Sequence, residues 1–317
     1  MTDTEFDIRS LPFPDALRWL RENGEPADPR TDIDTASLRR RFPRLASVTT
    51  TDLEVDSPHG PQPARLYRDA SAPASGRGLV WVHGGAFIGG YLDMPESNWV
   101  ALELAARGIP VFAVDYTKCL GDVHFPVPSD DVLAAWDHAR SNAQELLGVT
   151  PDGLVLGGAS AGGTLTAGAI ARLRDAGRDV PAGIVSVYPA AHPDGGHPGE
   201  IPDPASPMTQ IALNYAGSAE LLADPHVFPG LGSGEGFPPT LVVVCELDGL
   251  RPSGEAFAAL LADAGVDVAV HFEPGADHAH INEPADPTAL PTIEAIADWI
   301  GGRARFPALA ESESGAT

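Results

Sequence analysis

A serine set between glycines is the clearest candidate for chemistry in this sequence. Residues 158–162 read GASAG and follow the apolar run Leu154–Leu156 after one further glycine, Gly157. The pattern G-x-S-x-G is typical of a tight turn from a strand into a helix, which lifts the serine hydroxyl, here that of Ser160, above the edge of a sheet. Small residues are needed because side chains beside so sharp a turn would collide with the strand and the helix. A glycine-rich turn could instead cradle a phosphate, so the rest of the chain must decide.

A carboxylate and an imidazole follow Ser160 in an order that suits nucleophilic catalysis. Asp248 comes after the apolar run Thr240–Cys245, and His278 comes after the run Val268–Phe272. A serine hydroxyl is barely ionised at neutral pH, so a base must take its proton; an imidazole with a pKa of about 6.5 can do so. A carboxylate then holds the imidazole in the correct tautomer. We therefore predict a catalytic triad of Ser160, Asp248 and His278.

Neighbouring residues compete for two of these roles. Glu246 could replace Asp248 as the carboxylate, although it lies nearer the interior of its strand, and Asp277 is interpreted as a solvated turn residue. His280 could replace His278 as the base. The two histidines also form an H-x-H pair, which can bind zinc, but a zinc site needs a third and usually a fourth ligand and no such cluster lies nearby in the sequence. We predict no metal.

Backbone donors are expected just after another apolar run. The segment 83–87 reads HGGAF and follows Leu79–Val82. Acyl transfer passes through a tetrahedral oxyanion that N–H groups stabilise, and glycines let the backbone approach it closely. His83 is interpreted as a hydrogen-bonding brace of this loop. The predicted oxyanion hole consists of Gly84, Gly85, Ala86 and Ala161.

These side chains require a scaffold in which the ends of several strands meet. From residue 78 onward, solid apolar runs alternate with helical stretches, including a long helix expected from Ser129 to about Leu147. Strands buried on both faces and alternating with helices predict an α/β fold with a mostly parallel central sheet covered by helices on both faces. Alternating residues in 48–55 and 64–67, around a turn at 57–60, predict an antiparallel hairpin at the N-terminal edge of the sheet.

Three segments do not follow this alternation. Residues 1–46 are polar, with short amphipathic patches at 13–20 and 35–42 that need a surface to lie on. Residues 189–239 are rich in Pro and Gly and contain one expected helix near 207–215. So long an interruption predicts an excursion that covers something. Residues 303–317 are expected to form a flexible tail.

Further short motifs extend the pattern along the chain: Asp115-Tyr116, His124-Phe125-Pro126, Pro238-Pro239-Thr240 and Asp248-Gly249-Leu250-Arg251. With the HGGA loop and the serine turn, they make residues 79–300 resemble the hormone-sensitive-lipase-like branch of the α/β hydrolases, a group of bacterial carboxylesterases. The resemblance implies an α/β-hydrolase core of residues 47–188 and 240–302, with a helical cap formed by residues 1–46 and the inserted segment 189–239. It also implies a cleft that hydrolyses mostly short-acyl esters, and no cofactor.

The sequence departs from that family at several positions. Ala159 stands where the family usually has Asp before the nucleophile, and Ala86 replaces the third loop glycine. Residues 116–122 read YTKCLGD in place of Y-R-L-A-P-E, and H-A-H replaces H-G-F at 278–280. The last two changes bear on the rim of the pocket, so substrate preference does not transfer with the resemblance.

The predicted function is that of a serine carboxylesterase acting on a small-molecule ester. Aromatic residues near the motifs are candidate walls of a pocket for small or moderately apolar acyl groups: Phe87, Trp99, Phe125 and Tyr215. The same triad would serve an amidase, a lactonase or a detoxifying hydrolase of a bulkier substrate. A non-catalytic small-molecule-binding protein on the same fold is a further alternative, although such proteins often lose a triad member.

The net charge of the chain bears on which classes of partner it can bind. The chain has 44 acidic and 20 basic residues, a formal charge of −24, which would repel phosphate backbones and anionic lipid headgroups. We therefore expect no nucleic-acid and no membrane partner. The first residues lack a basic and an apolar region, and no later run has membrane-spanning length, so a cytoplasmic protein is expected. A homodimer is compatible with this prediction. With only Cys119 and Cys245, no disulfide framework is expected.

Overall fold

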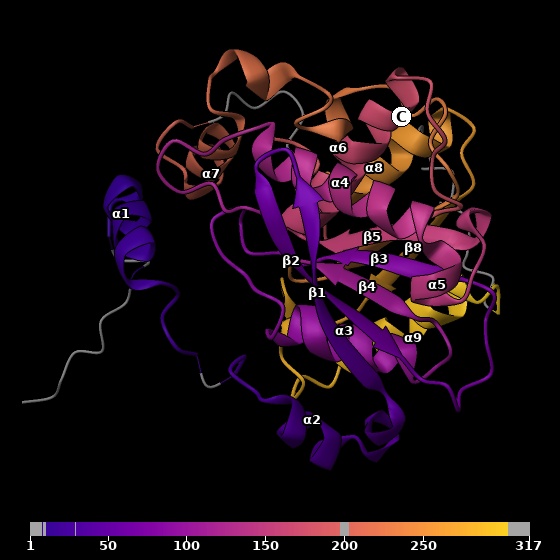
Figure 1. The fold of residues 1–317 in the computed structure, drawn as a ribbon. Helices are drawn as coiled ribbons and strands as arrows, with labels where there is room; N and C mark the ends of the chain where they lie inside the picture. The colour runs from indigo at the N-terminus through magenta and orange to yellow at the C-terminus, as the bar shows by residue number, and fades with distance from the viewer. Residues whose placement is uncertain (1–7, 9–10, 29, 197–202, 304–317) are drawn as a thin grey trace, which may run out of the picture.

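One eight-stranded sheet runs through the molecule (Figure 1). The computed structural model describes residues 8, 11–28, 30–196 and 203–303; the tail expected at 303–317 lies, but for its first residue, outside them. The strand order is β1-β2-β4-β3-β5-β6-β7-β8, with β3 to β8 parallel and β1 and β2 forming the predicted antiparallel hairpin at one edge. The predicted fold class is confirmed. The strands are β1 Thr49–Ser57, β2 Gly60–Arg68, β3 Gly78–Val82, β4 Val111–Val114, β5 Leu154–Ala159, β6 Ile184–Val187, β7 Thr240–Cys245 and β8 Val268–Glu273.

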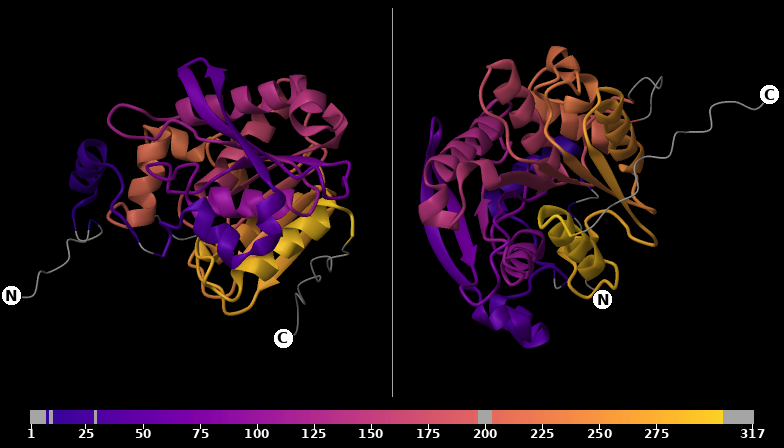
Figure 2. Two further views of the ribbon diagram at one scale, coloured as in Figure 1. Left: turned by 60° about the horizontal axis from the view of Figure 1, so that its bottom comes forward. Right: turned by 90° about the vertical axis from the view of Figure 1, so that its right-hand side faces the viewer.

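Both faces of the sheet are covered because successive apolar residues of each strand point to opposite sides. In β3, Leu79 and Trp81 join one buried cluster, whereas Val80 and Val82 join the other. Figure 2 shows the two helix layers on either side of the sheet. One layer contains α4 Val127–Ser141, α5 Ala143–Leu147, α6 Ala161–Asp175 and α8 Arg251–Asp263, and the other contains α3 Pro95–Ala105 and α9 Ala289–Ile300.

The single helix expected from Ser129 to Leu147 is in fact two helices, α4 and α5. Asn142 separates them: its backbone N–H and its side-chain amide both donate to the carbonyl of His138, at 3.1 and 2.8 Å. An asparagine side chain that competes for a backbone carbonyl in this way favours the end of a helix.

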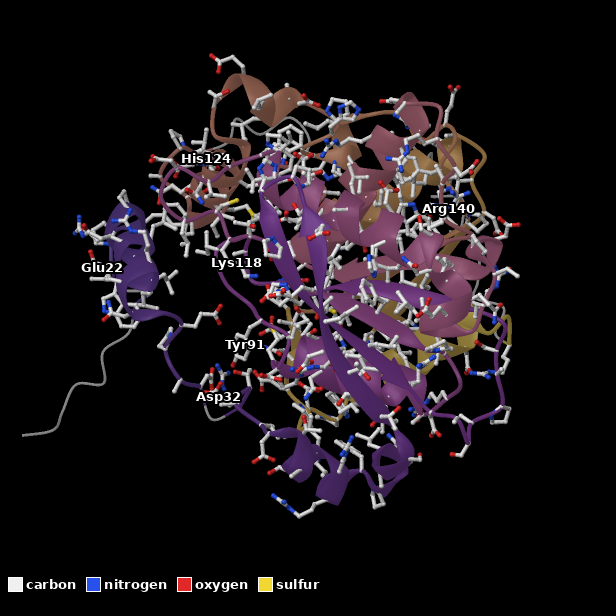
Figure 3. All side chains as sticks on the ribbon, in the orientation of Figure 1. Glu22, Asp32, Tyr91, Lys118, His124 and Arg140 are labelled. Carbon is white, nitrogen blue, oxygen red and sulfur yellow. The ribbon has the colours of Figure 1, made fainter. Side chains whose placement is uncertain are left out.

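The N-terminal helices lie on different parts of the molecule. Helix α1 (Phe13–Asn23) has no buried residue and stands to one side of the body in Figure 1. Helix α2 (Thr35–Arg41) and the short turn η2 (Pro43–Ser47) bury Leu38 and Leu45 in the cluster that contains α3. The segment between them is held by the Tyr91 hydroxyl, which donates to Asp32 at 2.8 Å (Figure 3). Residues 30–47 therefore pack beside α3.

The inserted segment contains the expected helix, α7 (Pro207–Ala216), and two short turns, η4 Glu220–Ala223 and η5 Pro229–Leu231. The hydroxyl of Ser206 caps α7 by accepting from the N–H of Thr209 at 3.1 Å. The helix lies beyond the carboxyl ends of the parallel strands (Figure 1). Within the residues that the structure describes, no helix is long and apolar enough to cross a membrane.

Candidate active site

Ser160 occupies the sharp turn between β5 and α6. Its backbone angles, φ 51° and ψ −120°, lie in a region that residues with a side chain seldom adopt. A Cβ on Gly162 would come within 2.2 Å of the Val82 carbonyl oxygen, and one on Gly158 within 2.5 Å of the Gly162 carbonyl group. The glycines of the G-x-S-x-G pattern are therefore required by close backbone approach, as the sequence predicted.

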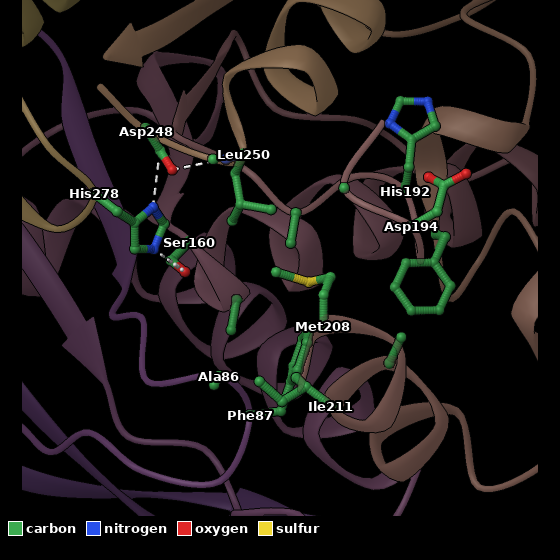
Figure 4. Close-up of a pocket in the computed structure, with 16 residues that line it drawn as sticks. Ala86, Phe87, Ser160, His192, Asp194, Met208, Ile211, Asp248, Leu250 and His278 are labelled. Atoms are coloured by element: carbon green, nitrogen blue, oxygen red, sulfur yellow. Dashed lines mark hydrogen bonds and ion pairs between the residues drawn. The ribbon is translucent and has the colours of Figure 1, made fainter. Parts of the chain in front are cut away.

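A chain of hydrogen bonds joins Ser160, His278 and Asp248 (Figure 4). The Ser160 hydroxyl lies 3.0 Å from Nε2 of His278, and Nδ1 of His278 lies 2.8 Å from Oδ2 of Asp248. Because the carboxylate can only accept, Nδ1 carries the proton and Nε2 accepts from the serine. The other oxygen of Asp248 accepts from the N–H of Leu250 at 2.8 Å, which fixes the carboxylate. The structure thus brings together the three residues that the sequence selected.

The groups around His278 favour the protonated form of its imidazole. The Asp248 side chain is only 2% exposed, whereas that of His278 is 33% exposed. Burial lowers the pKa of His278, but the hydrogen bond and charge of Asp248, with the charges of Glu96 and Asp277, outweigh burial and leave this pKa above its ordinary value. An imidazolium formed during a reaction would therefore be stabilised.

The competing residues have other partners. Glu246 is exposed and accepts from the N–H of Gly275 at 2.7 Å. His280 is buried, with its Nε2 2.8 Å from the hydroxyl of Thr292 and its Nδ1 3.4 Å from the sulfur of Cys245. Asp277 is exposed, in keeping with the solvated turn residue that was expected, and accepts from the N–H of the next residue, His278, at 2.7 Å.

The H-x-H pair does not form a common site, since His278 and His280 face different partners. Across the described part of the chain, no three His, Cys, Asp or Glu side chains are grouped so as to hold a metal ion.

The loop after β3 lies beside Ser160, since a Cβ on Gly84 would come within 3.1 Å of the Ser160 Cβ. Gly85, Ala86 and Phe87 have φ values of 111°, 52° and 64°, and a Cβ on Gly85 would come within 2.2 Å of the Gly89 carbonyl oxygen. The described residues supply no acceptor for the N–H groups of Gly85, Ala86 and Ala161. The predicted hole needs one correction: the N–H of Gly84 donates to the Glu96 carboxylate at 2.5 Å, so it is not available to a substrate.

Side chains beneath this loop hold it in place. Nδ1 of His83 is 2.7 Å from the Gly84 carbonyl oxygen, which also accepts from the Tyr116 hydroxyl at 3.0 Å. Nε2 of His83 is 3.0 Å from Asp115, which also pairs with Lys118. His83 therefore lies in the bracing position that the sequence predicted, and the Asp115-Tyr116 motif supports the same loop.

Glu96 is a site residue that the sequence analysis missed. It is 1% exposed, and its second carboxylate oxygen accepts from the Tyr188 hydroxyl at 2.6 Å. The ring of Tyr188 packs 4.8 Å from the ring of His278. Glu96 thus contacts both the loop of backbone donors and the residue behind the imidazole. An acidic residue in the first turn of a helix is common, because it interacts favourably with the helix dipole. The sequence therefore carries no separate signal for this role of Glu96.

A cavity of about 430 Å³ opens beside Ser160. Its walls are mainly apolar, and they include Met208 and Ile211 of α7, together with Phe87, Phe228 and Leu250. His192 and Asp194 lie at the end away from the triad (Figure 4). None of the described residues before residue 47 lines the cavity, whereas the inserted segment supplies much of one wall.

Of the four aromatic residues expected as pocket walls, Phe87 lines the cavity and the other three do not. Tyr215 lies behind Phe87, with the two rings stacked at 4.0 Å, and Phe125 meets the edge of Tyr215 at 6.2 Å. Trp99 lies in the cluster on the opposite face of the sheet and stacks on Phe42 at 5.2 Å. These three were misplaced because sequence order does not show which face of a helix or loop meets the cavity.

The model of the α/β-hydrolase fold family matches residues 79–282. The chain belongs to that family. This α/β hydrolase is 33% identical over 315 residues to the ethyl acetate hydrolase of Pseudomonas putida, with 89% of this chain and 98% of the relative covered. It is 29% identical to the esterase LipI of Mycobacterium tuberculosis, with 73% and 74% covered.

Solved structures agree with this placement. The hyperthermophilic esterase of Pyrobaculum calidifontis matches this hydrolase with a TM-score of 0.71 and 25% identity, over 91% of this chain and 96% of that one. Brefeldin A esterase, described as a bacterial homologue of human hormone-sensitive lipase, matches with a TM-score of 0.72 and 25% identity, over 90% and 92%. The protein is thus a carboxylesterase-type α/β hydrolase, and the resemblance to the hormone-sensitive-lipase-like branch is confirmed.

Proposed function

We propose that this hydrolase cleaves short-acyl carboxylic esters with Ser160 as nucleophile, His278 as general acid and base, and Asp248 as the residue that orients the imidazole. The observation that carries the proposal is the hydrogen-bond chain from Ser160 through His278 to Asp248, placed at one end of an apolar cavity. Such a chain lets a serine attack at neutral pH, because the proton has an acceptor.

In the acylation step, Oγ of Ser160 forms a bond to the carbonyl carbon of the ester while its proton passes to Nε2 of His278. The carbonyl oxygen takes on negative charge, and the N–H groups of Gly85, Ala86 and Ala161 stabilise it. The intermediate collapses as the bond to the alcohol oxygen breaks, and the alcohol leaves with the proton from His278. An acyl group then remains on Ser160.

In the deacylation step, water attacks the acyl carbon and gives a proton to Nε2 of His278. The second tetrahedral intermediate uses the same N–H groups. Its collapse breaks the bond to Ser160, returns the proton to Oγ and releases the carboxylic acid.

The preference for short acyl groups is supported by the size and lining of the cavity. About 430 Å³ with few polar atoms suits a small, partly apolar ester. The relative from Pseudomonas putida is named for a very small ester, ethyl acetate. We further propose that the inserted segment 189–239 is the cap of this site, since Met208 and Ile211 of α7 line the cavity.

The test is turnover of p-nitrophenyl acetate and butyrate by the wild type and by Ser160→Ala, with Ser141→Ala, an exposed serine, as the matched control. We expect activity to fall to background in Ser160→Ala and to be unchanged in Ser141→Ala. A fluorophosphonate probe should label the wild type and the control only. Equal turnover by wild type and Ser160→Ala would overturn the assignment.

The oligomeric state and the cellular location of the protein stay predictions. A homodimer is checked by light scattering of the purified protein, and a cytoplasmic location by fractionation of the source cells. Neither alters the chemistry proposed for Ser160.

A further inference from the structure

The cavity beside Ser160 has a second polar end, formed by Asp194. Asp194 lines the cavity at the end away from the triad, with the side chains of α7 between the two ends (Figure 4). One of its oxygens accepts from the N–H of Gly196 at 2.9 Å. Among the described residues the other oxygen has no hydrogen-bond partner and no ion pair. Asp248, the other carboxylate of the lining, is already hydrogen-bonded to His278.

His192, the nearest basic side chain of the lining, does not neutralise Asp194. Nε2 of His192 donates to the Gly230 carbonyl oxygen at 3.1 Å, so Nδ1 accepts from the Ser253 hydroxyl at 2.9 Å. Burial lowers the pKa of His192, and the charge of Asp194 only partly opposes this. At neutral pH both ring nitrogens are engaged and the ring is uncharged. Among the residues that the structure describes, the lining contains no lysine or arginine.

A carboxylate that has no counter-ion among the described residues, at the edge of an apolar cavity, favours the entry of a cation over that of an anion. Low-dielectric walls strengthen the field of Asp194 compared with the same group in water. A cation placed opposite it gains this attraction, and an anion is repelled. The aromatic ring of Phe228, which also lines the cavity, adds a face that a cation can approach.

We propose that the cavity takes esters that carry an alkylammonium group at the end away from the scissile bond, with Asp194 as the counter-ion. This inference rests on the proposed esterase function and names its substrate class. Asp194 contacts the substrate but takes no part in bond breaking. It therefore determines which substrate is preferred and not how the ester bond is cleaved.

The test compares charged esters with neutral esters of the same shape. One pair varies the alcohol: 2-(trimethylammonio)ethyl acetate against 3,3-dimethylbutyl acetate. The other pair varies the acyl group: p-nitrophenyl 4-(trimethylammonio)butanoate against p-nitrophenyl 5,5-dimethylhexanoate. Each pair differs only in a nitrogen or a carbon at the branched end. The ratio of kcat/KM values within a pair therefore reports the charge.

The variant is Asp194→Asn, which keeps the shape of the side chain and its acceptor for the Gly196 N–H. Asp203→Asn is the matched control, because Asp203 also accepts a backbone N–H two residues on, from Ala205 at 2.9 Å, yet is exposed and does not line the cavity. Both variants change the net charge equally, so a long-range effect would appear in both.

We expect the wild type to prefer the charged member of at least one pair, and Asp194→Asn to lower that charged-to-neutral ratio by about tenfold. Asp203→Asn should leave the ratio unchanged. An unchanged ratio in Asp194→Asn, or hydrolysis of p-nitrophenyl butyrate by the wild type without hydrolysis of either charged ester, would overturn the role of Asp194. Failure of the esterase proposal is distinct, because it would appear as equal turnover of p-nitrophenyl butyrate by wild type and Ser160→Ala.

Discussion

The carboxylate of Glu96 accepts a hydrogen bond from the backbone N–H of Gly84 at 2.5 Å, inside the loop proposed to supply the oxyanion donors. The other carboxylate oxygen accepts from Tyr188, whose ring packs against His278. One buried side chain therefore contacts both the loop after β3 and the tyrosine that packs against His278, the proposed general base. It also contributes negative charge that raises the pKa of His278.

Replacing Glu96 with Gln should lower kcat/KM and shift its pH profile. Loss of a charge-assisted hydrogen bond to the donor loop is expected to cost about tenfold in rate. The charges acting on His278 are those of Asp248, Glu96 and Asp277, and removing one of them lowers the pKa of His278. Since the proposed base is the neutral form of His278, the acidic limb of kcat/KM should move to lower pH. The measurement is p-nitrophenyl butyrate hydrolysis between pH 5 and 8.

Glu103→Gln is the control for this variant. Glu103 is a buried glutamate of the same helix, paired with Arg44 and Arg107. Its replacement should lower the melting temperature without moving the acidic limb. The same limb midpoint for wild type and Glu96→Gln would contradict the electrostatic part of the argument.

Asp248→Asn should lower kcat by about 10⁴ while leaving the fold intact. An asparagine amide can donate to Nδ1 of His278, which places the imidazole proton on Nε2, where it faces the Ser160 hydroxyl and cannot accept from it. Asp277→Asn is the matched control, since it also removes a negative charge near His278, but Asp277 accepts from the backbone N–H of His278 and not from its ring. A drop of similar size in both variants would mean that loop position, and not the tautomer, governs the rate.

Local patterns in the sequence were sufficient for the sheet and for Ser160, Asp248 and His278. The glycines around Ser160 are required by contacts within a few residues or with the adjacent strand. The local sequence therefore predicts the shape of this turn. Asp248 and His278 follow apolar runs, and the carboxyl ends of parallel strands meet at one edge of the sheet. The fold class and the three residues of the hydrogen-bond chain could therefore be predicted from the order of the apolar runs and of the polar residues that follow them.

The neighbours of the triad could not be predicted in the same way, because they depend on which faces meet. The N–H of Gly84 is taken by Glu96, twelve residues on and in a different element. Trp99 packs in the buried cluster between the sheet and helices α3 and α9, although its helix begins near the site. Asp194 lies in a part of the inserted segment that is rich in Pro and Gly, and such a composition carries no information on side-chain direction.

Phe87→Ala should shift the acyl preference toward longer chains. Phe87 forms part of the cavity wall, and its ring covers Tyr215 at 4.0 Å, so truncation extends the cavity toward that ring. The ratio of kcat/KM for p-nitrophenyl octanoate to that for the acetate should rise several-fold, with a loss of about 3 kcal/mol in the free energy of unfolding. Phe237→Ala, which removes a buried ring that packs on Phe257 away from the cavity, controls for that loss. An equal ratio in both variants would contradict a wall role for Phe87.

Ala159→Asp, which restores the acid usual in the family to the position before the nucleophile, should destabilise this protein. Ala159 is fully buried in an apolar cluster that includes Val155 and Val187, so an aspartate there would be a charge without a partner. The free energy of unfolding should fall by about 3 kcal/mol or more, measured by urea denaturation at pH 7. Ala159→Ser, a smaller polar change at the same position, should cost about 1 kcal/mol. If Ala159→Asp unfolds at the same urea concentration as the wild type, a partner for the new carboxylate lies within reach, and the absence of the acid would then bear on substrate range and not on the stability of the turn.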